Sequence, residues 1–132
     1  MLGAGSPPGP PIDLATFQLL NRLGSRGGNE PFAVRVARLF LKSSPVLMAG
    51  IHRGYAAQNC PAVYIAAHNL MSSSRTLGAL ELAKLANDLE SMAQAKLLVC
   101  AETLVDAIER EFQRVCDALE KLIPDPADTD LT

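Results

Sequence analysis

The chain has 132 residues and a mass of 14.1 kDa, the size of one domain with its own hydrophobic core. Apolar residues make up 48% of it and charged residues 20%, which excludes a wholly disordered chain. A formal net charge of −2, with 5% aromatic residues and no tryptophan, argues against nucleic-acid binding. The longest apolar stretches, such as 45–51 and 97–101, are far shorter than the ~20 residues of a membrane span.

The three cysteines, Cys60, Cys100 and Cys116, occur at spacings that fit neither a zinc site nor a disulfide frame. Their odd number indicates buried or half-buried free thiols in a reducing compartment. The Gly- and Pro-rich N-terminus shows no pattern of a signal peptide. We therefore expect a cytoplasmic domain.

The composition divides the chain into three parts. Residues 1–11 are rich in Gly and Pro, which indicates either a flexible tether to an upstream domain or the start of a stand-alone protein. Residues 12–123 carry helical patterns throughout and form the folded domain. Residues 124–132 are acidic and contain prolines, and we expect them to form a disordered tail.

Two helices are predicted in the first part of the domain. Asp13 can cap a short helix over 14–23, which a glycine then ends. The next pattern predicts one long helix over 31–55, bent at Pro45, with two helices broken at Ser43–Ser44 as the alternative. The apolar stripe expected to face the core is Phe32, Val36, Leu39, Phe40, Leu47, Gly50 and Ile51.

Three further helices complete the pattern. The third begins at Asn59, has Pro61 in its first turn and ends before Gly78. A fourth follows this glycine, and the last is expected over 96–122. Strand-like alternation is missing, and the loops are short. The sequence therefore predicts an all-α fold, an antiparallel four-helix bundle with a short extra helix at its N-terminus.

His68 is expected on the outer face of the third helix. The inward stripe of this helix centres between Val63, Ala67 and Leu70, and at about 100° per residue His68 lies roughly 140° from that centre. From its position alone, His68 is either a plain surface histidine or an accessible nucleophile near physiological pH. The same outer face carries Tyr64, Ile65, Ser72 and Arg75. The other histidine, His52, is interpreted as a plain surface residue.

The sequence around His68 resembles the signature of histidine phosphotransfer (HPt) domains. The stretch 66–90 reads AAHNLMSSSRTLGALELAKLANDLE, in which a His is followed by a Leu two residues later, a run of serines, Leu-Gly-Ala and Leu-Glu. The stretches DLATFQLLNRLG and RLFLKSSPVLMAGI are similar to the first and second helices of the family, so the resemblance covers about 12–122. The positions that match are His68, Leu70, Ser72, Ser73, Ser74, Leu77, Gly78, Ala79, Leu89 and Glu90.

This resemblance implies a phosphorelay intermediate of the kind found in bacterial hybrid sensor kinases. His68 would accept a phosphoryl group, through Nε2, from an aspartate of one receiver domain and pass it to another receiver domain. The chain shows no Gly-rich phosphate loop in its folded part, so we expect a phosphocarrier and not an enzyme with its own ATP site. No metal or other cofactor is expected on this chain, because the Mg²⁺ of the transfer should belong to the receiver.

One position departs from the family. A lysine that follows the histidine by three residues in the family is Met71 here. The resemblance implies that this lysine steadies the phosphoryl group, and Arg75, two turns along the same face, is the expected substitute. The departure also leaves open an alternative function, a helical adaptor that binds receiver domains without carrying phosphate.

The receiver is expected to dock on the outer faces of the second and third helices, with an apolar centre and a polar rim. A small Ser72 would leave room for its loops. The residues expected to meet it are Tyr64, Ile65, Met71, Val46, Leu47, Ala49, Gly50 and Arg53. We expect a monomer that contacts neither nucleic acid nor a membrane, either as a stand-alone protein or as a module tethered to a membrane-bound sensor kinase.

Overall fold

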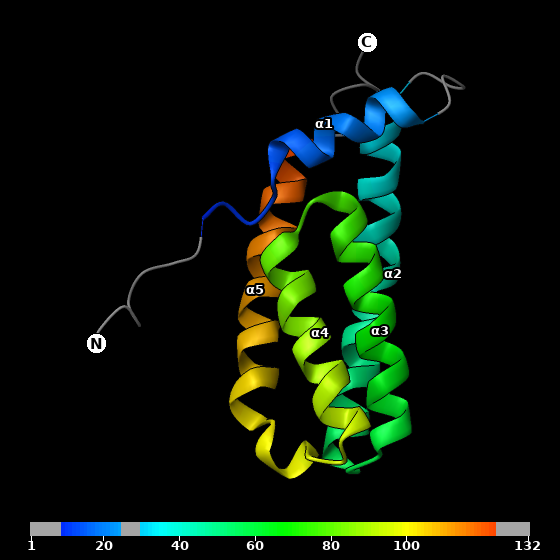
Figure 1. The fold of residues 1–132 in the computed structure, drawn as a ribbon. Coiled ribbons are helices and arrows are strands. Elements are labelled where there is room, and N and C mark those ends of the chain that lie inside the picture. Colours follow the sequence, from blue (N-terminus) through cyan, green and yellow to red (C-terminus); the bar gives the residue numbers. More distant parts are fainter. Residues whose placement is uncertain (1–8, 25–29, 124–132) are drawn as a thin grey trace.

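The computed structural model describes residues 9–24 and 30–123, which form α-helices and one short 3-10 turn and contain no strand. Helices α2 to α5 run alternately up and down beside one another, and α1 lies across one end of them (Figure 1). The prediction of an all-α bundle with a short additional N-terminal helix is therefore confirmed. The elements are α1 (Leu14–Leu23), α2 (Phe32–Ala56), α3 (Cys60–Leu77), α4 (Leu80–Gln94), η2 (Leu98–Cys100) and α5 (Glu102–Leu122).

Helix α3 packs against both α2 and α4, and this placement decides which of its residues meet solvent. Val63, Ala67, Leu70 and Leu77 are fully buried, as the helical spacing predicts. Burial of a side chain such as Leu70 stabilises the fold by about 1.5–3 kcal/mol. None of the described helices is long and apolar enough to cross a membrane.

Both ends of α3 form as the sequence predicts. The Asn59 side chain accepts a hydrogen bond from the Ala62 backbone N–H at 3.0 Å, and Pro61 lies in the first turn. Gly78 ends the helix with φ at 91°, in the left-handed region that favours glycine. A Cβ at this position would also lie 2.8 Å from the Asp13 carbonyl oxygen. The turn at Gly78 thus brings α4 back beside α3 and leaves room for the chain entering α1.

Helix α2 continues through Pro45 without interruption. Two serine hydroxyls just before the proline bond to carbonyl oxygens one turn back, Ser43 to Leu39 at 2.9 Å and Ser44 to Phe40 at 2.6 Å. Neither carbonyl is the one that Pro45 leaves without its helical donor, which is that of Leu41. The prediction of one long helix is confirmed, and the alternative break at Ser43–Ser44 is wrong.

The face that α2 turns to the core differs from the predicted stripe. Leu39 was expected inside but is 63% exposed, and Val36 and Leu47 are only half-buried. The small side chains of α2 mark its true inner face, because they let neighbouring helices approach closely. The residues that are buried there are Ala33, Val34, Ala37, Phe40, Ser44, Met48, Ile51 and Gly54.

The last helix begins later than predicted. The chain leaves α4 at Ala95, turns at Lys96 with a left-handed φ of 62°, and forms the 3-10 turn η2 before α5 starts at Glu102. Leu98 is buried under this turn. The apolar run over 97–101 continues the helical spacing in the sequence, but the chain must reverse direction here to place α5 beside α4.

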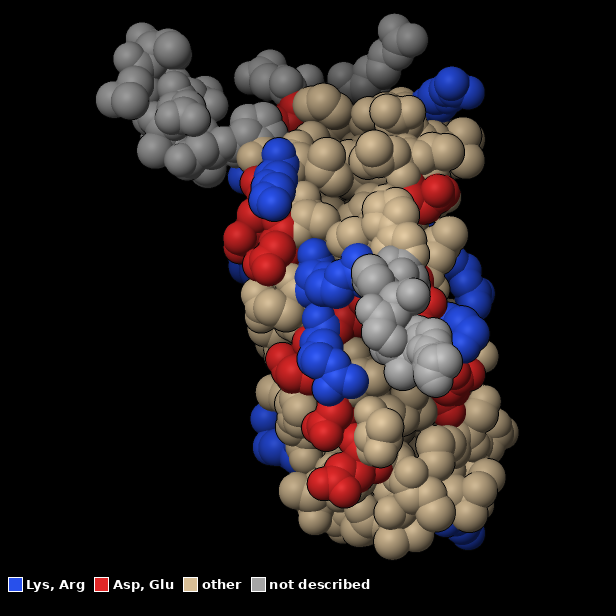
Figure 2. Space-filling view, turned by 90° about the vertical axis from the view of Figure 1, so that its left-hand side faces the viewer, with Lys and Arg blue, Asp and Glu red and all other residues tan. Residues whose placement is uncertain are grey.

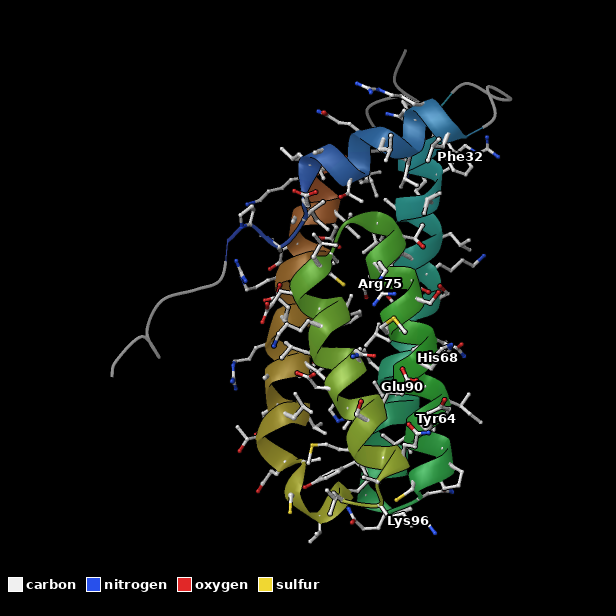
Figure 3. The ribbon with its side chains drawn as sticks, in the orientation of Figure 1. Phe32, Tyr64, His68, Arg75, Glu90 and Lys96 are labelled. Atoms are coloured by element: carbon white, nitrogen blue, oxygen red, sulfur yellow. The ribbon has the colours of Figure 1, made fainter. Side chains whose placement is uncertain are left out.

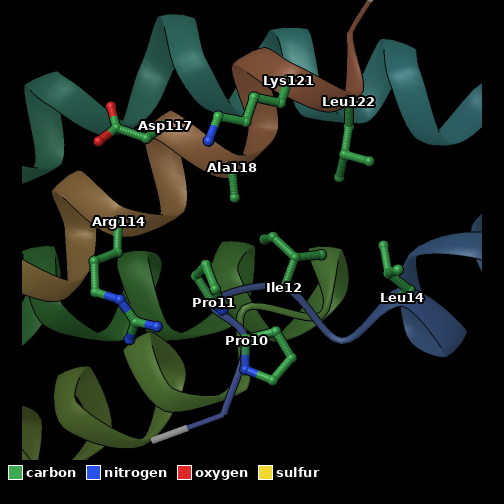
Figure 4. Close-up of a pocket in the computed structure, with 9 residues that line it drawn as sticks. All are labelled: Pro10, Pro11, Ile12, Leu14, Arg114, Asp117, Ala118, Lys121 and Leu122. Carbon is green, nitrogen blue, oxygen red and sulfur yellow. The ribbon is translucent and has the colours of Figure 1, made fainter. Parts of the chain in front are cut away.

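The described N-terminal stretch before α1 lies along α5 (Figure 4). The Arg114 guanidinium donates a hydrogen bond to the Gly9 carbonyl oxygen at 3.1 Å, and Ile12 is buried in the core. A pocket of about 420 Å³ opens between this stretch and the end of α5. The tail expected over 124–132, and residues 1–8 of the tether expected over 1–11, lie outside the described residues. Residues 9–11 of that tether are described and lie against the end of α5.

Candidate phosphoacceptor site

His68 lies midway along α3 and faces away from the bundle (Figure 3). Its side chain is 50% exposed, whereas the adjacent Ala67 and Leu70 on the inner side are fully buried. Because those buried neighbours fix the rotation of α3, they also fix the direction of the imidazole. The outward orientation predicted from the helical spacing is confirmed.

Glu90 of α4 contacts the imidazole from behind. Its Oε2 lies 3.2 Å from His68 Nδ1, and its side chain is only 14% exposed. An ionised carboxylate can only accept a hydrogen bond, so this pairing assigns the ring proton to Nδ1 and leaves the Nε2 lone pair free. The arrangement selects the nitrogen that can attack a phosphorus atom.

The second oxygen of Glu90 has an unusual environment. Oε1 is buried and has no hydrogen-bond partner among the described residues. A buried carboxylate oxygen without a partner destabilises a fold. The position of Glu90 therefore lowers the stability of the fold, which points to a role in orienting His68.

Sequence reasoning missed this contact because 22 residues separate the two side chains. From the sequence, Glu90 is identified only as the last residue of the family signature. A signal was nevertheless present: His68 precedes Gly78 by ten residues and Glu90 follows it by twelve, so an antiparallel hairpin turning at the glycine places them at similar heights.

Tyr64 holds the imidazole from the preceding turn of α3. The two ring centroids are 6.2 Å apart and the ring planes differ by 13°, which is a stacked arrangement. Tyr64 is half-buried and packs against the core. The ring of His68 is thus held by stacking on one side and by a carboxylate at Nδ1.

Met71 does not lie on the surface where we expected it. It is 8% exposed and belongs to the hydrophobic core, so it is not part of an apolar docking surface. The buried arc of α3 is wide because the helix has neighbours on two sides. A lysine here would have to extend its stem along the protein surface to bring its ammonium group into water.

Arg75 is the exposed cation on the same face of α3. It follows His68 by seven residues, which is a rise of about 10.5 Å along the helix, and both are seen on this face in Figure 3. Within the described part of the chain its guanidinium forms no ion pair or hydrogen bond. Helical side chains lean toward the N-terminus of their helix, which for Arg75 is the direction of the imidazole.

Ser72 is exposed, as expected, and lies beside a groove between α2 and α3. The groove has a volume of about 210 Å³. Ser73 is half-buried, and Ser74 is buried with a hydroxyl that has no partner among the described residues. The residues that line the groove are Val36, Leu39, Phe40, Ser43, Ser72, Ser73, Thr76 and Leu77.

The residues proposed for docking are divided between exposed and half-buried positions. Val46 on α2 and Ile65 on α3 are 68% and 59% exposed, which is unusual for large apolar side chains. Arg53 is also exposed, whereas Leu47 and Gly50 are half-buried. The structure adds Leu39, whose exposure the predicted stripe of α2 had missed.

The side of the molecule formed by α2 and α3 differs in charge from the side that carries α5. Residues 31–80, which include all of α2 and α3, contain no Asp or Glu. The exposed face that carries α5 shows acidic and basic side chains mixed together (Figure 2). The α2–α3 hairpin is therefore a basic element in a chain of net charge −2. Its basic residues are Arg35, Arg38, Lys42, Arg53 and Arg75.

His52 has a different setting. Its Nε2 lies 2.6 Å from Glu109 of α5, so this histidine is on the α2–α5 side of the bundle. The contact occupies the nitrogen that is free in His68. No three His, Cys, Asp or Glu side chains of the described residues gather into a possible metal site. The expectation that Mg²⁺ comes from the partner stays a prediction.

Comparison with known proteins agrees with the geometry. The family model described as Hpt domain matches residues 35–123. No curated protein sequence matches the chain. The fold is similar to the crystal structure of histidine-containing phosphotransfer protein B (HptB) from Pseudomonas aeruginosa PAO1, with a TM-score of 0.76 and 24% identity over 86% of this chain and 95% of that one. Since the family match covers more than half of the sequence, the chain belongs to the Hpt domain family.

Proposed function

We propose that His68 accepts a phosphoryl group from the aspartyl phosphate of a receiver domain and passes it to the aspartate of another. Histidine phosphotransfer in a phosphorelay is the role of the family. The observation that carries the assignment to His68 is its contact with Glu90, which holds the proton on Nδ1 and leaves Nε2 as the nucleophile. The other histidine has its Nε2 occupied.

The transfer step needs no added general base, because no proton has to leave the ring. The Nε2 lone pair forms a bond to phosphorus while the bond from phosphorus to the aspartate oxygen breaks, and the carboxylate leaves with the electron pair. The Nδ1 proton stays on the ring, which becomes positively charged. Glu90 stabilises this charge, and transfer to the next aspartate reverses the same step.

The positive charge of the α2–α3 hairpin favours the binding of an anionic partner. The transition state of phosphoryl transfer is loose and carries its charge on the phosphoryl oxygens, so positioning and charge neutralisation supply most of the acceleration. An approaching phosphorylated receiver meets no carboxylate on α2 or α3, since these helices contain none. We expect association to slow as ionic strength rises, because opposite charges steer the encounter.

The receiver docks over the outer faces of α2 and α3 in this proposal. Val46 and Ile65 supply exposed apolar contacts on the two helices, and Arg53 lies at the rim. The groove beside Ser72 gives room for a protruding part of the receiver. Arg75 then contacts the phosphoryl group in place of the family lysine.

The chain acts as a phosphocarrier module, and we infer that it relies on its partners for both ATP chemistry and Mg²⁺. It works as a monomer in the cytoplasm, alone or attached to a sensor kinase. The adaptor alternative, which binds receivers without accepting phosphate, rests on the replacement of the lysine by Met71. Labelling of His68 decides between the two.

The test uses a receiver domain carrying radiolabelled aspartyl phosphate. The wild-type chain should gain a label that acid removes and base does not. His68→Gln should lose it with a free energy of unfolding within about 0.5 kcal/mol of wild type, as is usual for exposed positions. His52→Gln serves as the matched control and should label normally. Label retained in His68→Gln would refute the assignment, and binding without label in the wild type would favour the adaptor.

A further inference from the structure

A second concave surface lies next to His68, on the side away from the α2–α3 groove. It is a pocket of about 480 Å³ between the first turns of α3 and the end of α4. Apart from Gln94 and Lys96, the side chains that line it are apolar or aromatic. They are Cys60, Pro61, Tyr64, Ile65 and Ala93.

Tyr64 connects this pocket with the phosphoacceptor. Its ring lines the pocket and stacks on His68 at a centroid distance of 6.2 Å. Figure 3 shows Lys96 beyond Tyr64 at the end of the bundle, whereas Arg75 lies beyond His68 in the other direction. The lysine forms no ion pair among the described residues. One cation therefore lies on each side of the phosphoacceptor in the direction of the α3 axis: Arg75 on α3 itself, and Lys96 after α4, at the rim of an apolar pocket.

The size of a docked receiver brings the pocket into the interface. A receiver must place its phosphorus about 3–3.5 Å from His68 Nε2 for transfer. A standard interface covers about 800 Å² on each partner, a disc of about 16 Å radius. The pocket begins one turn from His68, at Tyr64, and ends two turns away, at Cys60, which is about 12 Å along α3. It falls inside such a footprint.

We infer that this pocket receives an apolar side chain of the docked receiver domain, next to an acidic residue that pairs with Lys96, and that it selects among receivers. The inference rests on the proposed function, since it needs a receiver over His68. An apolar side chain that a pocket buries when the partners meet is a typical anchor of an interface, while a charge at the rim acts on the association rate. Receivers that lack the anchor would leave the pocket open and the lysine unpaired, which lowers their affinity.

The experiment compares transfer from a set of phosphorylated receiver domains of the same genome. Gln94→Trp fills the pocket from an exposed position, and Gln113→Trp makes the same change on α5, away from His68. For the receiver that labels the wild type fastest, Gln94→Trp should slow transfer at least about tenfold, the effect of losing an anchor. Gln113→Trp should change it less than about twofold, and phosphoramidate, a small donor, should label all three proteins equally.

Charge reversal provides the second arm. Lys96→Glu should slow transfer from the same receiver severalfold at low salt and less at high salt, because a rim charge acts through screened attraction. Lys121→Glu alters the net charge equally at the far end of α5 and should have no effect.

Three results would overturn the inference. Unchanged receiver transfer by folded Gln94→Trp would show that the receiver does not use the pocket. Equal slowing with phosphoramidate would show damage to His68 itself. A wild-type dimer that Gln94→Trp converts to a monomer would assign the pocket to a second copy of the chain. If the wild type accepts phosphate from no receiver, the proposed function fails and the inference with it.

Discussion

The carboxylate of Glu90 is the feature whose removal tests the chemistry of the site most directly. During transfer the ring of His68 gains a positive charge, and Glu90 Oε2 lies 3.2 Å from its Nδ1. The carboxylate therefore stabilises the transition state and the phosphorylated ring more than the free ring. We expect Glu90→Gln, which keeps an acceptor but removes the charge, to slow phosphorylation and to shift the equilibrium toward the receiver.

The structure sets the size of this effect. A hydrogen bond to a charged group contributes about 1.5–3 kcal/mol when water is excluded. The imidazole is 50% exposed and Glu90 only 14%, so solvent screens the pair from one side. We reduce the contribution to about 1–1.5 kcal/mol on that account. This corresponds to a rate that is lower by about 5-fold to 13-fold.

The assay measures the rate of label transfer from a phosphorylated receiver and from phosphoramidate. Both rates should fall in Glu90→Gln, because the defect lies in the nucleophile and not in docking. Glu109→Gln removes the carboxylate from the other histidine and should transfer at the wild-type rate. Nitrogen NMR of the wild type should show the proton of neutral His68 on Nδ1. Unchanged transfer by Glu90→Gln, or a proton on Nε2, would refute the reasoning.

The stability of a third variant, Glu90→Leu, shows whether Glu90 orients His68 or supports the fold. Glu90 buries one oxygen without a partner among the described residues, so an apolar side chain in its place should cost no stability. Glu90→Leu should unfold at the same temperature as the wild type or higher, yet transfer more slowly than Glu90→Gln. A lower Tm with normal transfer would mean that Glu90 supports the fold and not His68.

Three further predictions concern the surroundings of the site. Ser72→Trp should fold normally and slow transfer from every receiver while phosphoramidate labelling stays normal, because the bulky side chain blocks docking; equal loss with both donors would contradict this. Arg75→Ala should shorten the phosphohistidine lifetime and Met71→Lys should lengthen it, each within about tenfold because the site is screened by water; an unchanged lifetime in Arg75→Ala would show a solvated arginine without a role. Burial first, and nearby carboxylates second, raise the pKa of Cys116 to about 11. Folding therefore retains a proton that the unfolded thiol releases near pH 8.5, so stability should fall between about pH 8.5 and 11, and less so in Cys116→Ala, as measured by urea unfolding.

Much of the fold could be predicted because its signals are local. Asn59 and Gly78 bound α3 by their own backbone and side-chain preferences, and the apolar spacing between them gives the inner face. The start of α5 could not be predicted in this way. An apolar run at helical spacing fits equally a helix and a turn that buries Leu98, and only the reversal of the chain decides between them.

Errors about individual side chains have one common cause, which is that helix neighbours are not visible in a sequence. Met71 is buried because α3 has α2 on one side and α4 on the other, which widens the buried arc beyond the predicted stripe. Leu39 is exposed because the small residues of α2, Ala33 and Ala37 among them, face the core. The contact of Glu90 with His68 likewise exists only once the α3–α4 hairpin has closed.

The placement of negative charge explains how one surface can both attract a phosphorylated partner and activate a nucleophile. A carboxylate in front of Nε2 would repel the phosphoryl group, and the stretch 31–80 that forms this surface has none. The carboxylate that activates the ring comes instead from α4, where it lies against Nδ1, the nitrogen that does not attack, and is mostly buried. The carboxylate is thus nearer to the ring that becomes positive, at 3.2 Å from Nδ1, than to a phosphoryl group approaching Nε2. An acidic residue introduced at Ser72 should therefore slow transfer more than a neutral one of the same size, which a comparison of Ser72→Glu with Ser72→Gln measures. Equal rates for the two variants would mean that steric access alone governs the approach to His68.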